Sequence, residues 1–289
     1  PGLLVTEAAH SGTIVGTVTG LRLWSAGDIC DRWERQTEGH GKMRDPRYDI
    51  LFEPVKIGPK TTKNRFYQVP HCTALGTFSP HATAKFREIK AEGGWGVVNT
   101  ELCMIHPSSD SSPSGGERLW SDDDKPGLQL MVEAVQKHGA LAGCELTHQG
   151  ALAGNRMSRE RPMSASPRPA MDVPAVVRQM DKQDISDVRR WHRAAARRAR
   201  DIGFDIVYVY ASHMMGLPGD FITQRVNRRT DEYGGVIENR ARLLRELIED
   251  ELLMALPVVP RHDECPTAVP LASSAMVNSR GTARTRSPR

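Results

Sequence analysis

The residues of this chain best suited to chemistry stand where predicted strands end. An apolar, aromatic-rich run over residues 64–69 stops at a proline, and a histidine and a cysteine follow at once. The next three strand-like runs also end in polar groups. The strand-end residues are Pro70, His71 and Cys72 after the first run, Glu101 after the second, Glu145 and His148 after the third, and Tyr210 and His213 after the fourth. Because the carboxyl ends of parallel strands meet at one rim of a (β/α) barrel, we expect these groups to form a single site.

Cys72 is the candidate nucleophile, because a strand end holds the thiol rigidly and the thiolate is the reactive form of cysteine. The alternative is a small, buried, apolar cysteine, which is what we expect for Cys103 and Cys144. Tyr210 and His213 are close in sequence. A hydrogen bond between them would shift the proton affinity of the phenol and orient a substrate.

Four strand-then-helix units position these residues. The predicted strands cover residues 66–69, 95–100, 140–146 and 205–210, and the predicted helices cover residues 83–91, 128–137, 182–202 and 238–253. A hairpin over residues 51–63 precedes the first unit, and a Pro- and Ser-rich loop over residues 147–180 follows the third strand. Asp181 and Asp184 form a capping box at the start of the helix after that loop, and Gly203 ends it.

Such alternation predicts a parallel sheet with helical crossovers. Functional residues at each strand end favour half of an eight-fold barrel. We therefore predict an α/β fold, a parallel (β/α) barrel of the TIM type that is incomplete, with about four βα units and an N-terminal hairpin. A three-layer doubly wound sheet is the alternative, although no glycine-rich phosphate loop follows any strand.

The bulk composition excludes several classes of protein. The 289 residues carry 39 basic and 35 acidic side chains, a formal charge of +4, and we expect the arginines of residues 189–200 to form a solvated helix face. No recognised reading motif accompanies them, so we expect no nucleic-acid partner. The five cysteines match neither a disulfide framework nor a metal-binding spacing, so we predict no metal site. Without an apolar run of about 20 residues or a signal peptide, we expect no membrane partner and a cytoplasmic location.

The chain changes character at both ends. Residues 1–42 lack sustained periodicity, and residues 257–289 are rich in Pro, Ser, Thr and Arg without an amphipathic stretch. We expect the first segment to be an unstructured or non-native leader and the last to be a disordered tail, read in another frame. The coherent part, residues 43–256, is expected to be the N-terminal half of the barrel. Its open edges would favour self-association into a homo-oligomer.

Residues 44–250 are similar to the amino-terminal part of the barrel in the Old Yellow Enzyme class of NADH:flavin oxidoreductases. The matching stretches are residues 45–54, 63–72, 90–95, 139–143, 199–210, 229–235 and 238–240. Within this class the chain most resembles the trimethylamine, dimethylamine and histamine dehydrogenase subgroup. The resemblance implies an FMN-binding barrel, in which the carbon next to an amine nitrogen loses a hydride to the flavin.

The resemblance also implies contacts with the cofactor. In this subgroup the cysteine of a Pro-His-Cys motif is bonded through sulfur to the flavin, so Cys72, after Pro70 and His71, is the candidate attachment residue. Glu145 matches a carboxylate that accepts from the N–H groups of the flavin ring. The alternative for Glu145 is an ordinary strand-end carboxylate paired with an arginine. His148 is expected beside the cofactor.

On the substrate side, Tyr210 and His213 match the residues that flank substrate in the amine dehydrogenases. Leu102 stands where the trimethylamine enzyme has an aromatic residue that helps to box a cation. An aliphatic residue weakens that box, so trimethylamine itself is disfavoured. The expected partner is a small amine, and the resemblance leaves the electron acceptor open.

Two further features of the family bear on this chain. Its members continue through four more barrel units, which supply a phosphate-gripping arginine, and the amine dehydrogenases add cysteines for an iron–sulfur cluster. Cys265 stands without partners at cluster spacing, so we expect no cluster ligands here. Two alternative functions stay open: an ene-reductase or NADH:flavin oxidoreductase with non-covalent FMN, and an inactive remnant or binding module without turnover.

Overall fold

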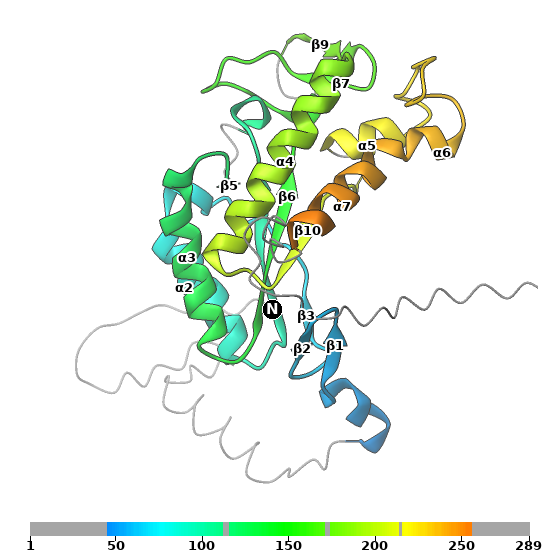
Figure 1. Ribbon diagram of the computed structural model, residues 1–289. Helices are drawn as coiled ribbons and strands as arrows, with labels where there is room; N and C mark the ends of the chain where they lie inside the picture. Colours follow the sequence, from blue (N-terminus) through cyan, green and yellow to red (C-terminus); the bar gives the residue numbers. More distant parts are fainter. Residues whose placement is uncertain (1–44, 112–115, 171–173, 214–215, 256–289) are drawn as a thin grey trace, which may run out of the picture.

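The computed structural model describes residues 45–111, 116–170, 174–213 and 216–255 (Figure 1). The expected leader and tail, residues 1–42 and 257–289, lie outside the described residues. A 3-10 helix, η1 (Pro46–Phe52), leads into an antiparallel hairpin of β1 (Val55–Ile57) and β2 (Lys60–Thr62). Gly58 takes φ +56° in the turn, which glycine adopts without strain. The predicted hairpin is therefore confirmed.

Four parallel strands form the main sheet. In chain order they are β3 (Tyr67–Gln68), β4 (Val97–Met104), β6 (Leu141–Thr147) and β10 (Ile206–Val209), and each pairs with the next. A short strand, β5 (Glu117–Arg118), pairs with the end of β4. A doubly wound sheet would reverse its strand order at a switch point. The sequential order among the described residues instead matches the predicted half-barrel, and the sheet does not close within them.

The helices that follow these strands cover one face of the sheet (Figure 1). They are α2 (Pro80–Glu92), α3 (Lys125–Gln136), α4 (Lys182–Ile202) and α7 (Arg242–Ala255). Apolar residues of the first three pack on Ala142, Cys144 and Leu146 of β6 in one core. Side chains alternate along a strand, so Gly143 and Glu145 face the opposite side, which is the barrel interior.

Helix α4 begins and ends where the sequence predicts. Asp181 and Asp184 each accept a hydrogen bond from the other's backbone amide, both at 2.8 Å. Gly203 closes the helix with φ +102°. The arginine face of α4 is only partly solvated, because Arg189 forms two hydrogen bonds to Asp250 of α7.

Three predictions about local structure are wrong, and the first concerns residues 147–180. Residues 147–180 are not a plain loop, because they contain a 3-10 turn and a small three-stranded sheet. These elements are η5 (Gly150–Leu152), β7 (Met163–Ser164), β8 (Arg168–Pro169) and β9 (Val176–Gln179). Strands this short carry too few residues for periodicity to reveal. The small sheet lies beyond the carboxyl ends of the main strands, and the β1–β2 hairpin lies at the opposite end (Figure 1).

The predicted final helix is also interrupted. Residues 238–253 fall in two helices, α6 (Ile237–Arg240) and α7, and a further helix, α5 (Gly216–Ile222), precedes them. The guanidinium of Arg240 donates to the carbonyl oxygens of Ile222 and Gly235, which ties α6 to the turn before it. The remaining 3-10 turns are η2 (Gly76–Phe78), η3 (Pro107–Ser109) and η4 (Asp122–Asp124). Within the described ranges, no helix has the length and apolar character needed to span a bilayer.

A β-bulge in β4 decides which of its side chains face the barrel interior. Asn99 of β4 pairs with Gly143 of β6, and Leu102 of β4 pairs with Glu145 of β6. Between these two pairs the chain advances by three residues in β4 but by only two in β6. The extra residue on β4 reverses its alternation, so Leu102 lies beside Glu145 while Cys103 packs in the helix-side core. The sequence predicts that this strand ends at residue 100, where the bulge begins. The strand instead continues to Met104.

Candidate active site

The structure brings Cys72, Glu145 and Tyr210 together near the carboxyl ends of the strands of the main sheet. Glu145 pairs with Leu102 on one side and with Tyr208 on the other, and Tyr210 directly follows β10. The Leu102 amide donates a hydrogen bond to the Cys72 sulfur. The charge of Glu145 reaches both the Cys72 thiol and the Tyr210 phenol. A thiol, a carboxyl group and a phenol therefore share one rim.

Cys72 presents its thiol on this rim as an exposed residue. Partial burial of the sulfur raises the pKa of the thiol, the Leu102 amide lowers it, and the charges of Glu101 and Glu145 raise it further. The thiol is therefore protonated at neutral pH. A reaction at the sulfur needs a group that takes up this proton, because the thiolate is the nucleophile.

Glu145 offers a carboxyl group that no described residue satisfies. Its backbone amide donates to Thr100 Oγ1 at 3.1 Å, but no hydrogen bond or ion pair from a described residue reaches its side chain. Burial raises the pKa of Glu145 to about 7. At neutral pH the group is therefore a mixture of acid and carboxylate, able to donate or to accept. The expected alternative, a pair with an arginine, does not occur among the described residues.

Tyr210 and His213 form a direct pair. The phenol oxygen lies 2.8 Å from His213 Nδ1, and the two rings are stacked with centroids 6.1 Å apart. Burial raises the pKa of Tyr210, and the charges of Glu145 and Cys72 raise it further. The phenol therefore keeps its proton, and a hydrogen bond joins its oxygen to the imidazole. His213 adopts φ +57°, a conformation that a non-glycine residue takes only where its surroundings hold it.

Pro70 and His71 carry the chain from β3 to Cys72. The His71 amide donates to the Thr100 carbonyl oxygen at 3.3 Å, which extends the pairing of β3 with β4. The imidazole is exposed, with its centroid 6.2 Å from the Phe86 ring of α2. These two residues therefore shape the rim mainly through their backbone.

His148 lies on the helix side of the sheet, away from this rim. The ring is fully buried, with Nε2 at 2.9 Å from Ser108 Oγ and Nδ1 accepting from the Gly150 amide at 3.1 Å. It stacks on Trp191 of α4 with centroids 5.9 Å apart. Burial lowers the pKa of His148 to about 3. Both ring nitrogens are therefore in hydrogen bonds. The sequence holds one signal for this placement: His148 is two residues after Leu146, and alternate residues of a strand face the same side, here the helices.

Three buried charged residues form a cluster of which two members, Arg87 and Glu101, act on Cys72, and two of the three are absent from the sequence-based site. Arg87 of α2 and Glu117 of β5 join Glu101, which the sequence treats only as a strand-end acid. Burial raises the pKa of Glu117 to about 7. The signal for Arg87 is its spacing, because it falls between Ala84 and Ala91 on the buried face of α2.

Tyr67 and Tyr208 fill the barrel interior below the rim. Their rings meet edge to face with centroids 6.3 Å apart, and the Tyr67 phenol is hydrogen-bonded to the Asn99 side chain. Gly143 admits this arrangement, because an added Cβ would lie 1.8 Å from Asn99 Oδ1. These residues form the packed floor of the site.

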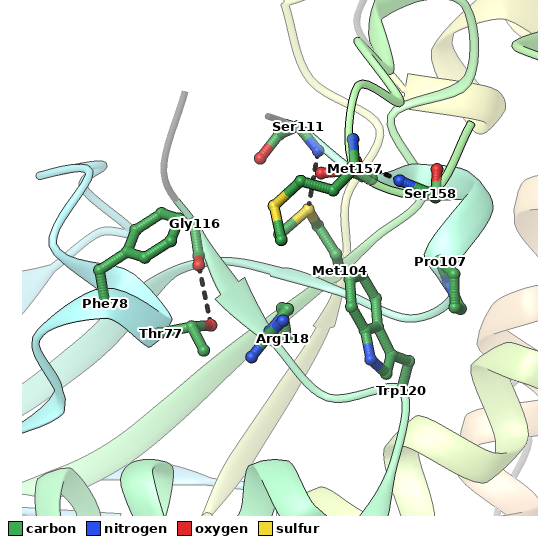
Figure 2. Close-up of a pocket in the computed structure, with 11 residues that line it drawn as sticks. Thr77, Phe78, Met104, Pro107, Ser111, Gly116, Arg118, Trp120, Met157 and Ser158 are labelled. Carbon is green, nitrogen blue, oxygen red and sulfur yellow. Dashed lines mark hydrogen bonds between the residues drawn. The ribbon is translucent and has the colours of Figure 1, made fainter. Parts of the chain in front are cut away.

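A separate pocket of about 240 Å³ lies beside β5 (Figure 2). Figure 2 shows the thioethers of Met104 and Met157 in its wall, with Trp120 and Phe78. The remaining lining residues are Thr77, Pro107, Asp110, Ser111, Gly116, Arg118 and Ser158. None of the predicted site residues lines this mostly apolar pocket.

Within the described ranges, no group of three His, Cys, Asp or Glu side chains is arranged to hold a metal ion.

A family model and several known proteins match most of the chain. Residues 50–251 match the model of a family described as "NADH:flavin oxidoreductase / NADH oxidase family". Dimethylamine dehydrogenase of Hyphomicrobium sp. (strain x) is 46% identical over 215 residues, which are 71% of this chain and 29% of that protein. The chain therefore spans less than a third of the length of this relative.

Two solved structures share both sequence and shape with the chain. Histamine dehydrogenase from Rhizobium sp. 4-9 is 47% identical with a TM-score of 0.71, over 73% of this chain and 33% of that one. 6-Hydroxypseudooxynicotine amine oxidase from Pseudomonas geniculata N1 is 54% identical with a TM-score of 0.70, over 72% of this chain and 32% of that one.

Proposed function

The chain belongs to the NADH:flavin oxidoreductase / NADH oxidase family, and we propose that it serves the FMN-dependent oxidation of a carbon–nitrogen bond in a small amine. The observation that carries the proposal is the shared rim, where Glu145 of β6 lies close enough to Cys72, after β3, and Tyr210, after β10, for its charge to act on both. The names of the relatives support the substrate class, because dimethylamine dehydrogenase and histamine dehydrogenase are both named for amines.

The residues of the rim fit a flavin. The Glu145 carboxyl group is unsatisfied within the described residues and can accept from a ring N–H. Leu102, beside it in the sheet, offers an apolar edge to a planar ring. When bound, FMN supplies the two-electron acceptor for a hydride from the carbon next to the amine nitrogen. The resulting iminium adds water and splits into an aldehyde and the smaller amine.

Cys72 is the proposed point of attachment. Its sulfur would hold the flavin ring covalently, and forming that bond would release the thiol proton and a ring hydrogen and pass two electrons to an oxidant such as dioxygen. The raised pKa of the thiol means that attachment is slow unless a base near the rim takes the proton. The half-ionised Glu145 carboxyl group is one such base on the same rim.

Tyr210 and His213 are the proposed substrate-side residues. A hydrogen bond joins the phenol oxygen to the imidazole, and a lone pair of that oxygen stays open to accept from an N–H group of an amine. Leu102 gives this side an aliphatic wall in place of an aromatic box. We therefore expect a primary or secondary amine, held by hydrogen bonds, to be preferred over a fully substituted cation.

An absorbance spectrum of the FMN-loaded chain before and after acid precipitation tests the proposal. We expect flavin to stay with the precipitated wild-type protein and to be released from Cys72→Ser. Cys265→Ser, which removes a different thiol, is the control and should retain its flavin. Anaerobic addition of dimethylamine or histamine should bleach the flavin band. A chain that shows no saturable FMN binding would refute the proposed function.

A second candidate function is that of a reductase that binds FMN without a covalent bond to Cys72. The raised pKa of the Cys72 thiol works against attachment and favours a reductase with non-covalent FMN. NADPH dehydrogenase of Halalkalibacterium halodurans is a relative of this kind by name, 32% identical over 205 residues. Release of all flavin by acid, with reduction of the band by NADPH and not by amines, would select this candidate.

A further inference from the structure

The peptide groups on either side of Cys72 are held by charged side chains from other elements. On one side, the guanidinium of Arg87 in α2 donates to the carbonyl oxygen of His71. On the other side, Glu101 Oε2 in the bulge of β4 accepts from the Thr73 amide at 2.6 Å. Arg87 and Glu101 are both fully buried, so water does not compete for these bonds.

The same carboxylate oxygen also holds a strained residue. Ala74 has φ +58°, a left-handed conformation that is costly for a residue other than glycine, and its amide donates to Glu101 Oε2 at 3.0 Å. Two successive amides that converge on one oxygen form an anion-binding nest. Gly76 then passes so close that an added Cβ would lie 2.7 Å from Glu101 Oε1. The loop that carries Cys72 is therefore shaped around this carboxylate.

The charge of Glu101 is offset within the same cluster. Burial lowers the pKa of Arg87, while the charges of Glu101 and then Glu117 raise it. Arg87 Nε and Nη1 have no hydrogen-bond partner among the described residues, nor has Glu101 Oε1. The attraction between the two charges therefore acts through space, and the hydrogen bonds of Glu101 are left for the loop.

We propose that Glu101 is a positioning residue for Cys72, which orients the thiol toward the rim shared with Glu145 and Tyr210 and restricts its motion. The effect of Glu101 on flavin attachment rests on the proposed function. The restraint on the thiol exists in the flavin-free chain as well.

Two single variants separate the reach of the Glu101 side chain from its charge. Glu101→Asp keeps a charge opposite Arg87 but withdraws the carboxylate by one methylene from the amides of Thr73 and Ala74. Glu101→Gln keeps an oxygen within reach of these amides but removes the charge. In the flavin-free chain, alkylation of Cys72 by iodoacetamide is measured across pH by mass spectrometry of the peptide that contains it. The profile gives both the pKa of the thiol and the limiting rate of the thiolate.

We expect Glu101→Asp to raise the limiting rate about fivefold, because a loosened loop exposes the thiolate. Glu101→Gln should lower the pKa of the thiol, since a nearby negative charge is lost, and should leave the limiting rate within about twofold of wild type. Glu92→Gln, an exposed position at the end of α2, is the matched control and should behave as wild type. A wild-type limiting rate in Glu101→Asp overturns the proposal. If circular dichroism shows that Glu101→Gln does not fold, the limiting rate of Glu101→Asp relative to wild type tests the proposal by itself.

Flavin loading separates this inference from the proposed function. If both hold, Glu101→Asp retains a smaller fraction of acid-stable flavin than wild type under the same loading conditions. If wild type retains none, attachment at Cys72 is refuted, and the limiting alkylation rate still decides the role of Glu101.

Discussion

Acid is expected to loosen the packing around His148, and His148→Gln should remove part of that sensitivity. The ring is fully buried, with both nitrogens in hydrogen bonds to Ser108 and Gly150. A proton on it would have to be buried among other basic groups. Burial is the main reason that the pKa of His148 falls to about 3, and the charges of His106, His192 and Arg178 lower it further.

The sign and size of the effect follow from proton linkage. The unfolded chain takes up a proton on this histidine below its ordinary pKa of 6.5, whereas the folded chain stays neutral down to about pH 3. Stability is therefore full above pH 6.5 and falls as the pH drops from 6.5 toward 3. At 1.36 kcal/mol per pH unit, His148 alone removes about 2 kcal/mol of unfolding free energy between pH 7 and pH 5.

Urea unfolding at pH 7, 6 and 5 measures this loss. His148→Gln removes hydrogen bonds and should cost about 1–3 kcal/mol at every pH, but its stability should fall less steeply with acid. Part of the loss of unfolding free energy with acid should remain in this variant, because burial also lowers the pKa of His106, to about 4. His81→Gln, at an exposed position of α2, should keep the wild-type slope. Equal slopes for His148→Gln and wild type would refute the reasoning.

Three further predictions concern stability. Burial raises the pKa of Glu145 to about 7, so ionisation of its carboxyl group weakens folding as the pH rises from 4.5 to 7. Glu145→Gln should therefore stabilise the flavin-free chain by about 3 kcal/mol at pH 8 and by about 1 kcal/mol near pH 5. An unchanged urea midpoint at pH 8 would contradict this. Asp181→Ala should lower the stability of the chain by about 1 kcal/mol, because it removes the cap of α4, and a thermal melt measures the loss. Gly143→Ala should lower the free energy of unfolding by about 3 kcal/mol or more, because the new methyl group would collide with Asn99 Oδ1. Full solubility with an unshifted melting temperature would contradict this prediction, because it would mean that Asn99 and Tyr208 can move to make room.

Local signals in the chain account for the parts of the fold that were predicted. The capping box of Asp181 and Asp184, the left-handed Gly203 and the turn at Gly58 each act within a few residues, so their effect is visible in a single sequence. The small sheet over residues 163–179 was missed, because its strands depend on pairing with one another and carry almost no periodicity. The placement of His148 was missed for a similar reason, since burial against Trp191 is a contact between distant segments.

From residue types and their order alone, a thiol, a carboxyl group, a phenol and an imidazole could be assigned to the ends of successive parallel strands, because strand alternation and helix caps are local properties. Which of these groups lie close together became known from the folded chain. The bulge in β4 set Leu102 beside Glu145 and freed Glu101 to hold the loop of Cys72. These are contacts between residues far apart in the chain, whose free energy depends on burial and on partners that no local pattern reveals.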